Sequence, residues 1–311
     1  MTWKRFVPAL LLAAAAVACS GRAPLPPPAA VASAPTAPEP EPPTPPPGLT
    51  GLEHLLDLPG QATTIHYSPG ALDRAARVQE RAELLASVFH KVDQRPMPME
   101  IWVLEREDWT AAGLARPYGV PETVGEGWFA LPAWGDPDQV RTMTRLLGGS
   151  PPVASSVPLR GTAEEAATLT VADEMFQLQA AADFGRRVGL VGDRPWVDGV
   201  LAHLVARIAF ERFEPGRMLG IVSTFDRFTA RFGGQASRRA DDYQEGLPLE
   251  SDLWYQAQFL RGADVLWVKE GENGSVRYLY KVIQRGTPLP AAELERAYPA
   301  LTQWRATSFA P

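Results

Sequence analysis

The sequence predicts one mostly helical α+β domain, with a small N-terminal sheet, over residues 51–311. Three observations support this fold class. Short apolar runs typical of strands occur only in the first third of that region. From residue 162 onward the apolar residues recur at helical spacing. The preceding residues 20–50 are rich in Pro and Ala and cannot build a core, so they are predicted to form an extended linker.

The first 19 residues are typical of an export signal. Lys4 and Arg5 precede an apolar run over 6–17, and Ala16-Val17-Ala18-Cys19 resembles a bacterial lipobox with Ala where Leu is usual. The resemblance implies lipidation of Cys19, an anchor in the bacterial cell envelope and, because Ser20 follows, the outer membrane. An ordinary cleaved signal and an uncleaved anchor are the alternatives.

The composition limits the classes of partner and the means of stabilising the domain. The net charge of −6 argues against nucleic acid. The single cysteine leaves no internal disulfide, so burial must stabilise the domain. The linker is interpreted as a spacer, with a proline-rich ligand for a partner protein as the alternative.

The first elements are expected in the order helix, strand, short helix, strand, helix. Their predicted ranges are 71–90, 99–104, 105–113, 127–131 and 136–147. A Gly/Ser/Pro loop at 148–158 follows.

A long buried helix is predicted next, since its apolar residues cover most of its circumference. Thr162 and Glu165 match a capping box at its start, and Gly185 is expected to end it. Pro195 suits the first turn of the next helix, on which Asp198 is expected to point at the long helix. Helices continue to a closing one at 291–298, interrupted by a turn at Asn273-Gly274 with Ser275 as the following cap.

Two segments carry the main functional hypothesis. The first reads Asp173-Glu174-Met175-Phe176-Gln177, and Trp196-Val197-Asp198-Gly199-Val200-Leu201-Ala202 follows. They resemble the gluzincin metallopeptidases, in which His-Glu-x-x-His precedes Trp-x-x-Glu-Gly-x-Ala. The resemblance implies a zincin-like domain with a helical C-terminal subdomain. It puts Asp173 and Gln177 at the two His positions and Asp198 at the Glu position, while Glu174 is retained.

These replacements predict that no zinc is bound, because zinc prefers imidazole and thiolate ligands. A weak calcium or magnesium site on Asp173, Asp198 and the Gln177 carbonyl, or zinc on other ligands, are the alternatives. Without a metal the carboxylates would repel one another, so the Gln177 amide is expected to bridge Asp173 and Asp198. His203 is expected to be packed or solvent-facing.

The sequence therefore predicts an envelope-anchored lipoprotein with a catalytically inactive, cofactor-free peptidase-like domain. Its role would be binding or scaffolding, with a protein, peptide or cell-wall ligand. The alternatives are a divergent hydrolase that uses Glu174, with an unusual metal or none, and a structural surface protein without a ligand.

Overall fold

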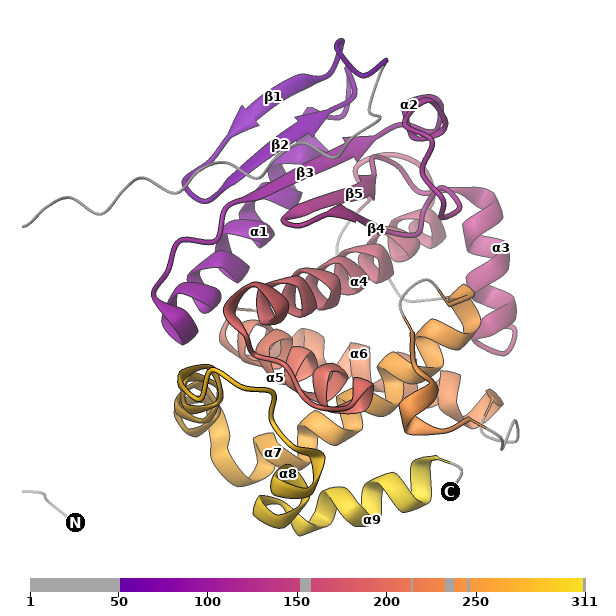
Figure 1. Ribbon diagram of the computed structural model, residues 1–311. Coiled ribbons are helices and arrows are strands. Elements are labelled where there is room, and N and C mark those ends of the chain that lie inside the picture. Colours follow the sequence, from indigo (N-terminus) through magenta and orange to yellow (C-terminus); the bar gives the residue numbers. More distant parts are fainter. Residues whose placement is uncertain (1–50, 152–157, 214, 233–237, 245–246, 310–311) are drawn as a thin grey trace, which may run out of the picture. The chain divides into compact units, whose positions relative to one another are not determined.

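The computed structural model shows a small sheet followed by a helical region (Figure 1). The predicted signal, Cys19 and the linker lie outside the described residues, which are 51–151, 158–213, 215–232, 238–244 and 247–309. This confirms the predicted α+β fold class, with the sheet at the N-terminal end and helices at the C-terminal end.

The sheet has five strands in the order β1-β2-β3-β5-β4. Its central strands β2, β3 and β5 are parallel, and the outer strands β1 and β4 pair antiparallel with β2 and β5. The bounds are β1 Leu56–Pro59, β2 Thr63–Tyr67, β3 Met99–Leu104, β4 Glu122–Gly125 and β5 Trp128–Pro132. The sequence predicted β3 and β5, but β1, β2 and β4 were missed.

Each predicted helix has a counterpart in the structure. The helices are α1 Leu72–Asp93, α2 Arg106–Ala111, α3 Pro137–Leu146, α4 Ala163–Val188, α5 Pro195–Phe213, α6 Pro215–Phe232, α7 Leu249–Gln284, α8 Ala291–Ala297 and α9 Pro299–Ser308, with a short 3-10 turn at Ala240–Asp242. By the hydropathy of the described residues, none of these helices could cross a membrane.

The main core forms where α1 and α4 cover one face of the sheet. Alternate side chains of the strands point to this face. Phe129 of β5 packs edge-on against Phe176 of α4, and Phe89 of α1 stacks on Phe184 of α4 with 4.3 Å between ring centroids. Helix α4 thus lies between the sheet and the helices α5, α6 and α7 (Figure 1). This position explains why its apolar residues surround it.

The opposite face of the sheet carries a second, aromatic cluster. Trp102 and Trp128 of the strands meet Trp109 of α2 there, and all three side chains are buried. Trp102 and Trp128 therefore serve as core residues of the sheet.

The start of α4 follows the prediction, but its end does not. Thr162 and Glu165 form the capping box: Glu165 N donates to Thr162 Oγ1 at 3.2 Å, and Thr162 N donates to the Glu165 carboxylate at 2.7 Å. The helix passes through Gly185 and ends at Val188, with Gly189 in the left-handed region at φ 76°. Gly185 instead permits close packing, because a Cβ there would lie 3.0 Å from the Leu190 carbonyl oxygen.

The interruption in the C-terminal helices also differs from the prediction. It lies at Gly271, where φ 61° and ψ −172° break the helical path of α7. Asn273-Gly274 forms no separating turn, and Ser275 is fully buried inside the helix. The Gly271 backbone angles are open to glycine alone, which fixes the break there.

Candidate functional site

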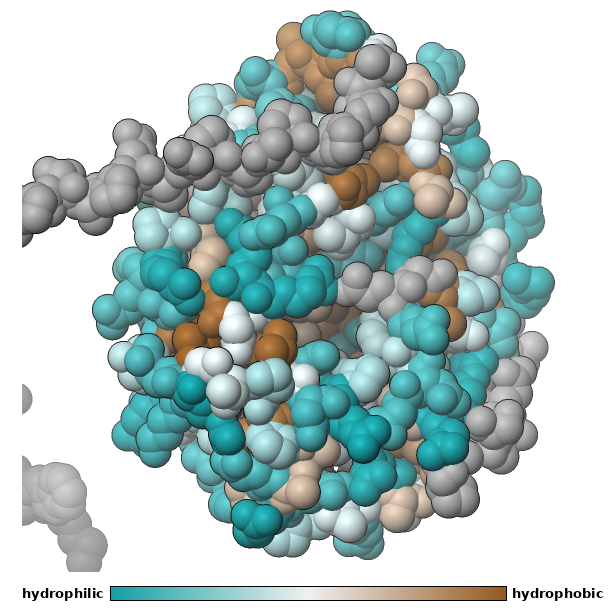
Figure 2. Space-filling model, in the orientation of Figure 1, coloured by the Kyte–Doolittle hydropathy of each residue, from teal (hydrophilic) through white to brown (hydrophobic). Residues whose placement is uncertain are grey.

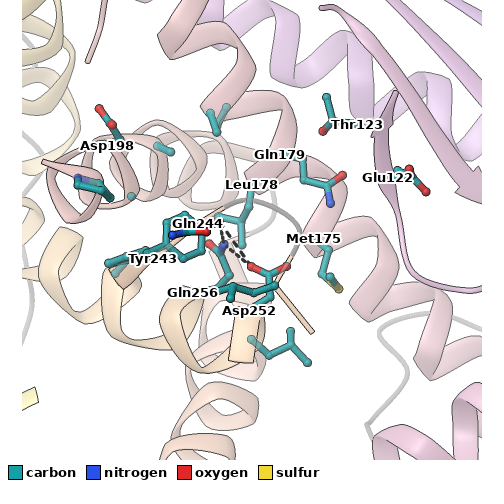
Figure 3. A pocket seen from close by; sticks show the side chains of 18 of the residues that line it. Glu122, Thr123, Met175, Leu178, Gln179, Asp198, Tyr243, Gln244, Asp252 and Gln256 are labelled. Carbon is teal, nitrogen blue, oxygen red and sulfur yellow. Dashed lines mark hydrogen bonds between the residues drawn. The ribbon is translucent and has the colours of Figure 1, made fainter. Parts of the chain in front are cut away.

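A pocket of about 780 Å³ lies between β4, α4, α5 and the first part of α7 (Figure 3). A volume of this size is typical of sites for small molecules or short peptide segments. Its described lining residues include Arg116, Val120, Glu122, Thr123, Met175, Leu178, Gln179, Ala182, Arg186, Asp198, Gly199, Ala202, Tyr243, Gln244, Asp252, Gln256 and Phe259.

One face of α4 forms a wall of the pocket. Met175, Leu178, Gln179 and Ala182 are spaced three and four residues apart, so they share that face. On the neighbouring helix, Gly199 lets α7 approach, because a Cβ at this position would fall 2.3 Å from the Phe259 ring. The small residue therefore holds α5 and α7 together at the pocket.

The wall on the sheet side is organised by Glu122. Its carboxylate accepts hydrogen bonds from the backbone N–H groups of Ala115 at 3.3 Å and Arg116 at 2.9 Å. Gln179 Nε2 donates to the Pro121 carbonyl at 3.0 Å and so fastens α4 to this loop. The buried Oε1 of Gln179 accepts no hydrogen bond within the described residues.

A partly buried polar network, centred on the buried Asp252, forms the opposite side. Asp252 Oδ2 accepts from both terminal nitrogens of Arg116 at 3.2 Å. Gln256 Nε2 donates to Asp252 Oδ1 and to the Tyr243 hydroxyl, each at 2.9 Å. Figure 3 shows Tyr243, Asp252 and Gln256 close together beside the pocket. Because its donors are already in place, the Asp252 carboxylate is held in one orientation.

Asp173 does not belong to this pocket. It is buried on the side of α4 that faces α1, where Arg74 holds it through two hydrogen bonds of 2.5 and 3.1 Å and Arg81 adds a second ion pair. The positive charge beside Asp173 therefore comes from guanidinium groups of α1.

Glu174 and Gln177 are buried on α4, outside the pocket lining. The Gln177 Oε1 atom accepts no hydrogen bond in the described chain, and no hydrogen bond there joins its side chain to Asp173 or Asp198. The predicted Gln177 bridge is therefore wrong, because Asp173 is already neutralised by arginine.

Asp198 is exposed at the start of α5 and lines the pocket. Its Oδ1 accepts from the backbone N–H of Gly192 at 2.6 Å, so it closes the loop before the helix. Asp198 thus shares the pocket with one face of α4, as expected of a residue directed at that helix, but it does not lie beside Asp173. Its position in the first turn of α5 explains this, since a carboxylate there readily accepts backbone N–H groups.

The residues present do not fit a zinc ion. The described part of the chain contains no group of three or more His, Cys, Asp or Glu side chains arranged to hold a metal. Asp173, Glu174 and Asp198 consequently do not form the acidic cluster expected from the sequence. Whether their positions descend from metal ligands stays a prediction.

His203 is packed, one of the two outcomes expected. It is 1 % exposed, and burial lowers its pKa to about 4, so the ring is neutral at pH 7. Its Nδ1 lies 2.8 Å from the Gly199 carbonyl, which requires the proton on that nitrogen. It lies behind the pocket wall rather than in it.

The sequence analysis missed most of the pocket. Met175 lies inside the motif segment but was given no role, and Gln179 follows that segment by two positions. Arg116, Tyr243, Asp252 and Gln256 were given no role either. The helical spacing of Met175, Leu178 and Ala182 was visible, but it resembles any buried stripe.

Comparisons with known proteins identify no family for this chain. No protein-family model matches the chain, and neither does any curated protein. Among solved structures, the chain is similar to a mutant M1 zinc metallopeptidase from Deinococcus radiodurans bound to a Tyr-Ser-Ala substrate. The similarity has a TM-score of 0.37 and 13% sequence identity, and it covers 82% of this chain and 51% of that one. The chain thus spans about half the length of that protein, and no argument about activity rests on this match.

Proposed function

We propose that this chain is an envelope lipoprotein, anchored through Cys19, whose peptidase-like domain binds a ligand in the pocket without cleaving it. The observation that carries the proposal is the pocket lining. Among the described residues it contains no His, Cys, Ser or Lys, and its hydroxyl groups belong to Thr123 and to Tyr243, which accepts a hydrogen bond from Gln256. Its acids already accept hydrogen bonds: Glu122, Asp198 and Asp252.

An extended peptide, from a protein or the cell wall, is the ligand that these walls suit best. Strand β4 is at the edge of the sheet, and Glu122 and Thr123 of this strand line the pocket. An unpaired strand edge can hydrogen-bond an extended peptide along its backbone. Met175, Leu178 and Phe259 offer apolar contacts to its side chains.

The surface supports binding in the pocket rather than on a flat face. On the side shown in Figure 2 hydrophilic residues dominate, and hydrophobic side chains appear in small separate groups. A domain that binds through an open face would be expected to expose a larger contiguous apolar patch.

The test is a binding screen of the full chain against arrayed peptides and peptidoglycan fragments. Ala182→Trp fills the pocket and should weaken binding by ten-fold or more, since about 1.4 kcal/mol suffices for that loss. Glu164→Trp, on the exposed first turn of the same helix, is the matched control. Equal binding by both variants would contradict the proposal.

Mass spectrometry of the incubated peptides decides between binding and hydrolysis. Intact peptides support a binding role, whereas products that disappear with Glu174→Gln would favour the divergent hydrolase. Incorporation of labelled palmitate that is lost in Cys19→Ala tests the anchor.

A further inference from the structure

The two walls of the pocket come from distant parts of the chain, and an ion pair between Arg116 and Asp252 connects them. Arg116 belongs to the loop between α2 and β4, whereas Asp252 belongs to the first turn of α7. Both residues line the pocket, and they are 136 positions apart in sequence. Their contact therefore joins the sheet-side wall to the helical wall.

The backbone at each end of this pair is fixed. The Arg116 N–H donates to Glu122, and its carbonyl accepts from Trp109 Nε1 at 2.9 Å. The Asp252 N–H donates to the Pro248 carbonyl at 3.0 Å. Because both backbones are held, the side-chain pair is the part of this connection that can open.

Both partners would remain solvated or hydrogen-bonded after the pair opens. Arg116 is 20% exposed and can turn into water, while Asp252, at 7%, keeps Gln256 as a donor and the N-terminal end of α7 as a favourable field. The Arg74–Asp173 pair is different, since both side chains are almost fully buried and breaking such a pair is costly. The Arg116–Asp252 pair can thus open at modest cost.

We propose that the Arg116–Asp252 ion pair is a clasp that closes the pocket, and that ligand enters when the clasp opens. The inference rests on the proposed function, because it describes how access to the same pocket is controlled. It assigns Arg116 and Asp252 a positioning role and requires no chemistry from either of them.

A thiol placed inside the pocket measures the clasp without any ligand. Ala182→Cys puts the thiol on the pocket face of α4, and Cys19 is the chain's one native cysteine. Alkylation of the full chain by uncharged N-ethylmaleimide, followed by peptide mass spectrometry, gives the rate at position 182. Because lipidation would occupy the Cys19 thiol, the rate at position 182 in the urea-unfolded chain serves as the reference.

In the Ala182→Cys background, Asp252→Asn and Arg116→Gln should each raise the alkylation rate in the pocket about five-fold. Loss of a weak ion pair can raise the population of the open pocket by about this factor. Asp264→Asn is the control, because it removes the Arg207–Asp264 pair between α5 and α7, which is not part of the pocket lining. It should leave the rate unchanged.

The charge-swapped double variant Arg116→Asp with Asp252→Arg should restore slow alkylation, which separates loss of the clasp from misfolding. Unchanged rates in both single variants, or a swap as fast as either of them, would overturn the proposal. A working clasp in a protein that binds none of the screened ligands would instead count against the proposed function alone.

Discussion

Asp173 and Asp198 have the same side chain and occupy comparable places in the sequence motif, yet their surroundings are opposite. Asp173 is 3 % exposed and held by two arginines of α1. Asp198 is exposed and accepts a backbone N–H from the loop before α5. Both residues are aspartates at positions of the same motif, so the sequence alone does not distinguish them. The helix face on which each one lies decides whether the carboxylate is structural or accessible to a ligand.

The two sides of α4 show the same contrast. The side toward α1 combines Asp173 with aromatic core residues, whereas the pocket side carries Met175, Leu178 and Ala182. The Asp173 charge is therefore buried away from the candidate site, whereas Arg186, near the end of α4, lines it. A charged residue inside an apolar helix need not mark the functional face.

The largest expected effect separates the two aspartates directly. Asp173→Ala removes the carboxylate that pairs with Arg74 and Arg81, and breaking a buried pair in this way costs about 3–5 kcal/mol. Asp198→Ala removes the exposed hydrogen bond from the Gly192 N–H, and such a bond is worth about 1 kcal/mol. Urea unfolding of both variants measures their free energies of unfolding. Similar losses of stability in the two variants would contradict the contrast between Asp173 and Asp198.

A smaller effect is expected at His66, which is more exposed than Asp173 and more buried than Asp198. It lies on the face of the sheet opposite α1 and α4, where its ring stacks on Trp128. Burial opposes its charge, but hydrogen bonds to Glu100 at 2.9 Å and Asp57 at 2.7 Å outweigh it and raise the pKa of His66. A raised folded-state pKa stabilises the fold fully below the unfolded value of about 6.5, and this contribution is lost as pH rises through the folded-state pKa.

His66→Gln should therefore be less stable than the wild type at pH 5.5, by up to about 1 kcal/mol for a partly exposed pair. The gap should narrow by pH 8.5. Urea midpoints at the two pH values test this, with an NMR titration of the His66 ring. A gap that widens with pH would have the wrong sign.

The smallest expected effect is none. Gln177→His together with Asp198→Glu supplies two good zinc ligands while leaving Asp173 in its ion pairs. Because the structure does not bring these positions together, the zinc content should stay at the wild-type level. Stoichiometric zinc in the variant, measured by elemental analysis with Gln177→His alone as the control, would show that the positions converge.

Much of the fold could be predicted because its signals are local. The capping box at Thr162 and the apolar run of β3 identify their elements without reference to the rest of the chain. The short outer strands β1 and β4 have four residues each and depend on their neighbours in the sheet, so the sequence pattern does not reveal them.

The site was harder to predict for a related reason. Arg74 lies 99 positions before Asp173, and helical periodicity gives no sign that an arginine of α1 would meet it. The motif resemblance selected Asp173, Glu174 and Gln177 of α4, none of which lines the pocket, while Met175, Leu178 and Ala182 of the same helix do. Contacts between distant segments therefore decided the site.

The break at Gly271 has a consequence for how the domain could vary. A Cβ at this position would meet open space, so the glycine is required by its backbone angles and not by crowding. The part of α7 before it carries Asp252 and Gln256, and the part after it leads to α8 and α9. One residue without a side chain thus sets the angle at which the C-terminal arm leaves the binding half. Replacing it would re-aim that arm while leaving the sequence of the binding half untouched.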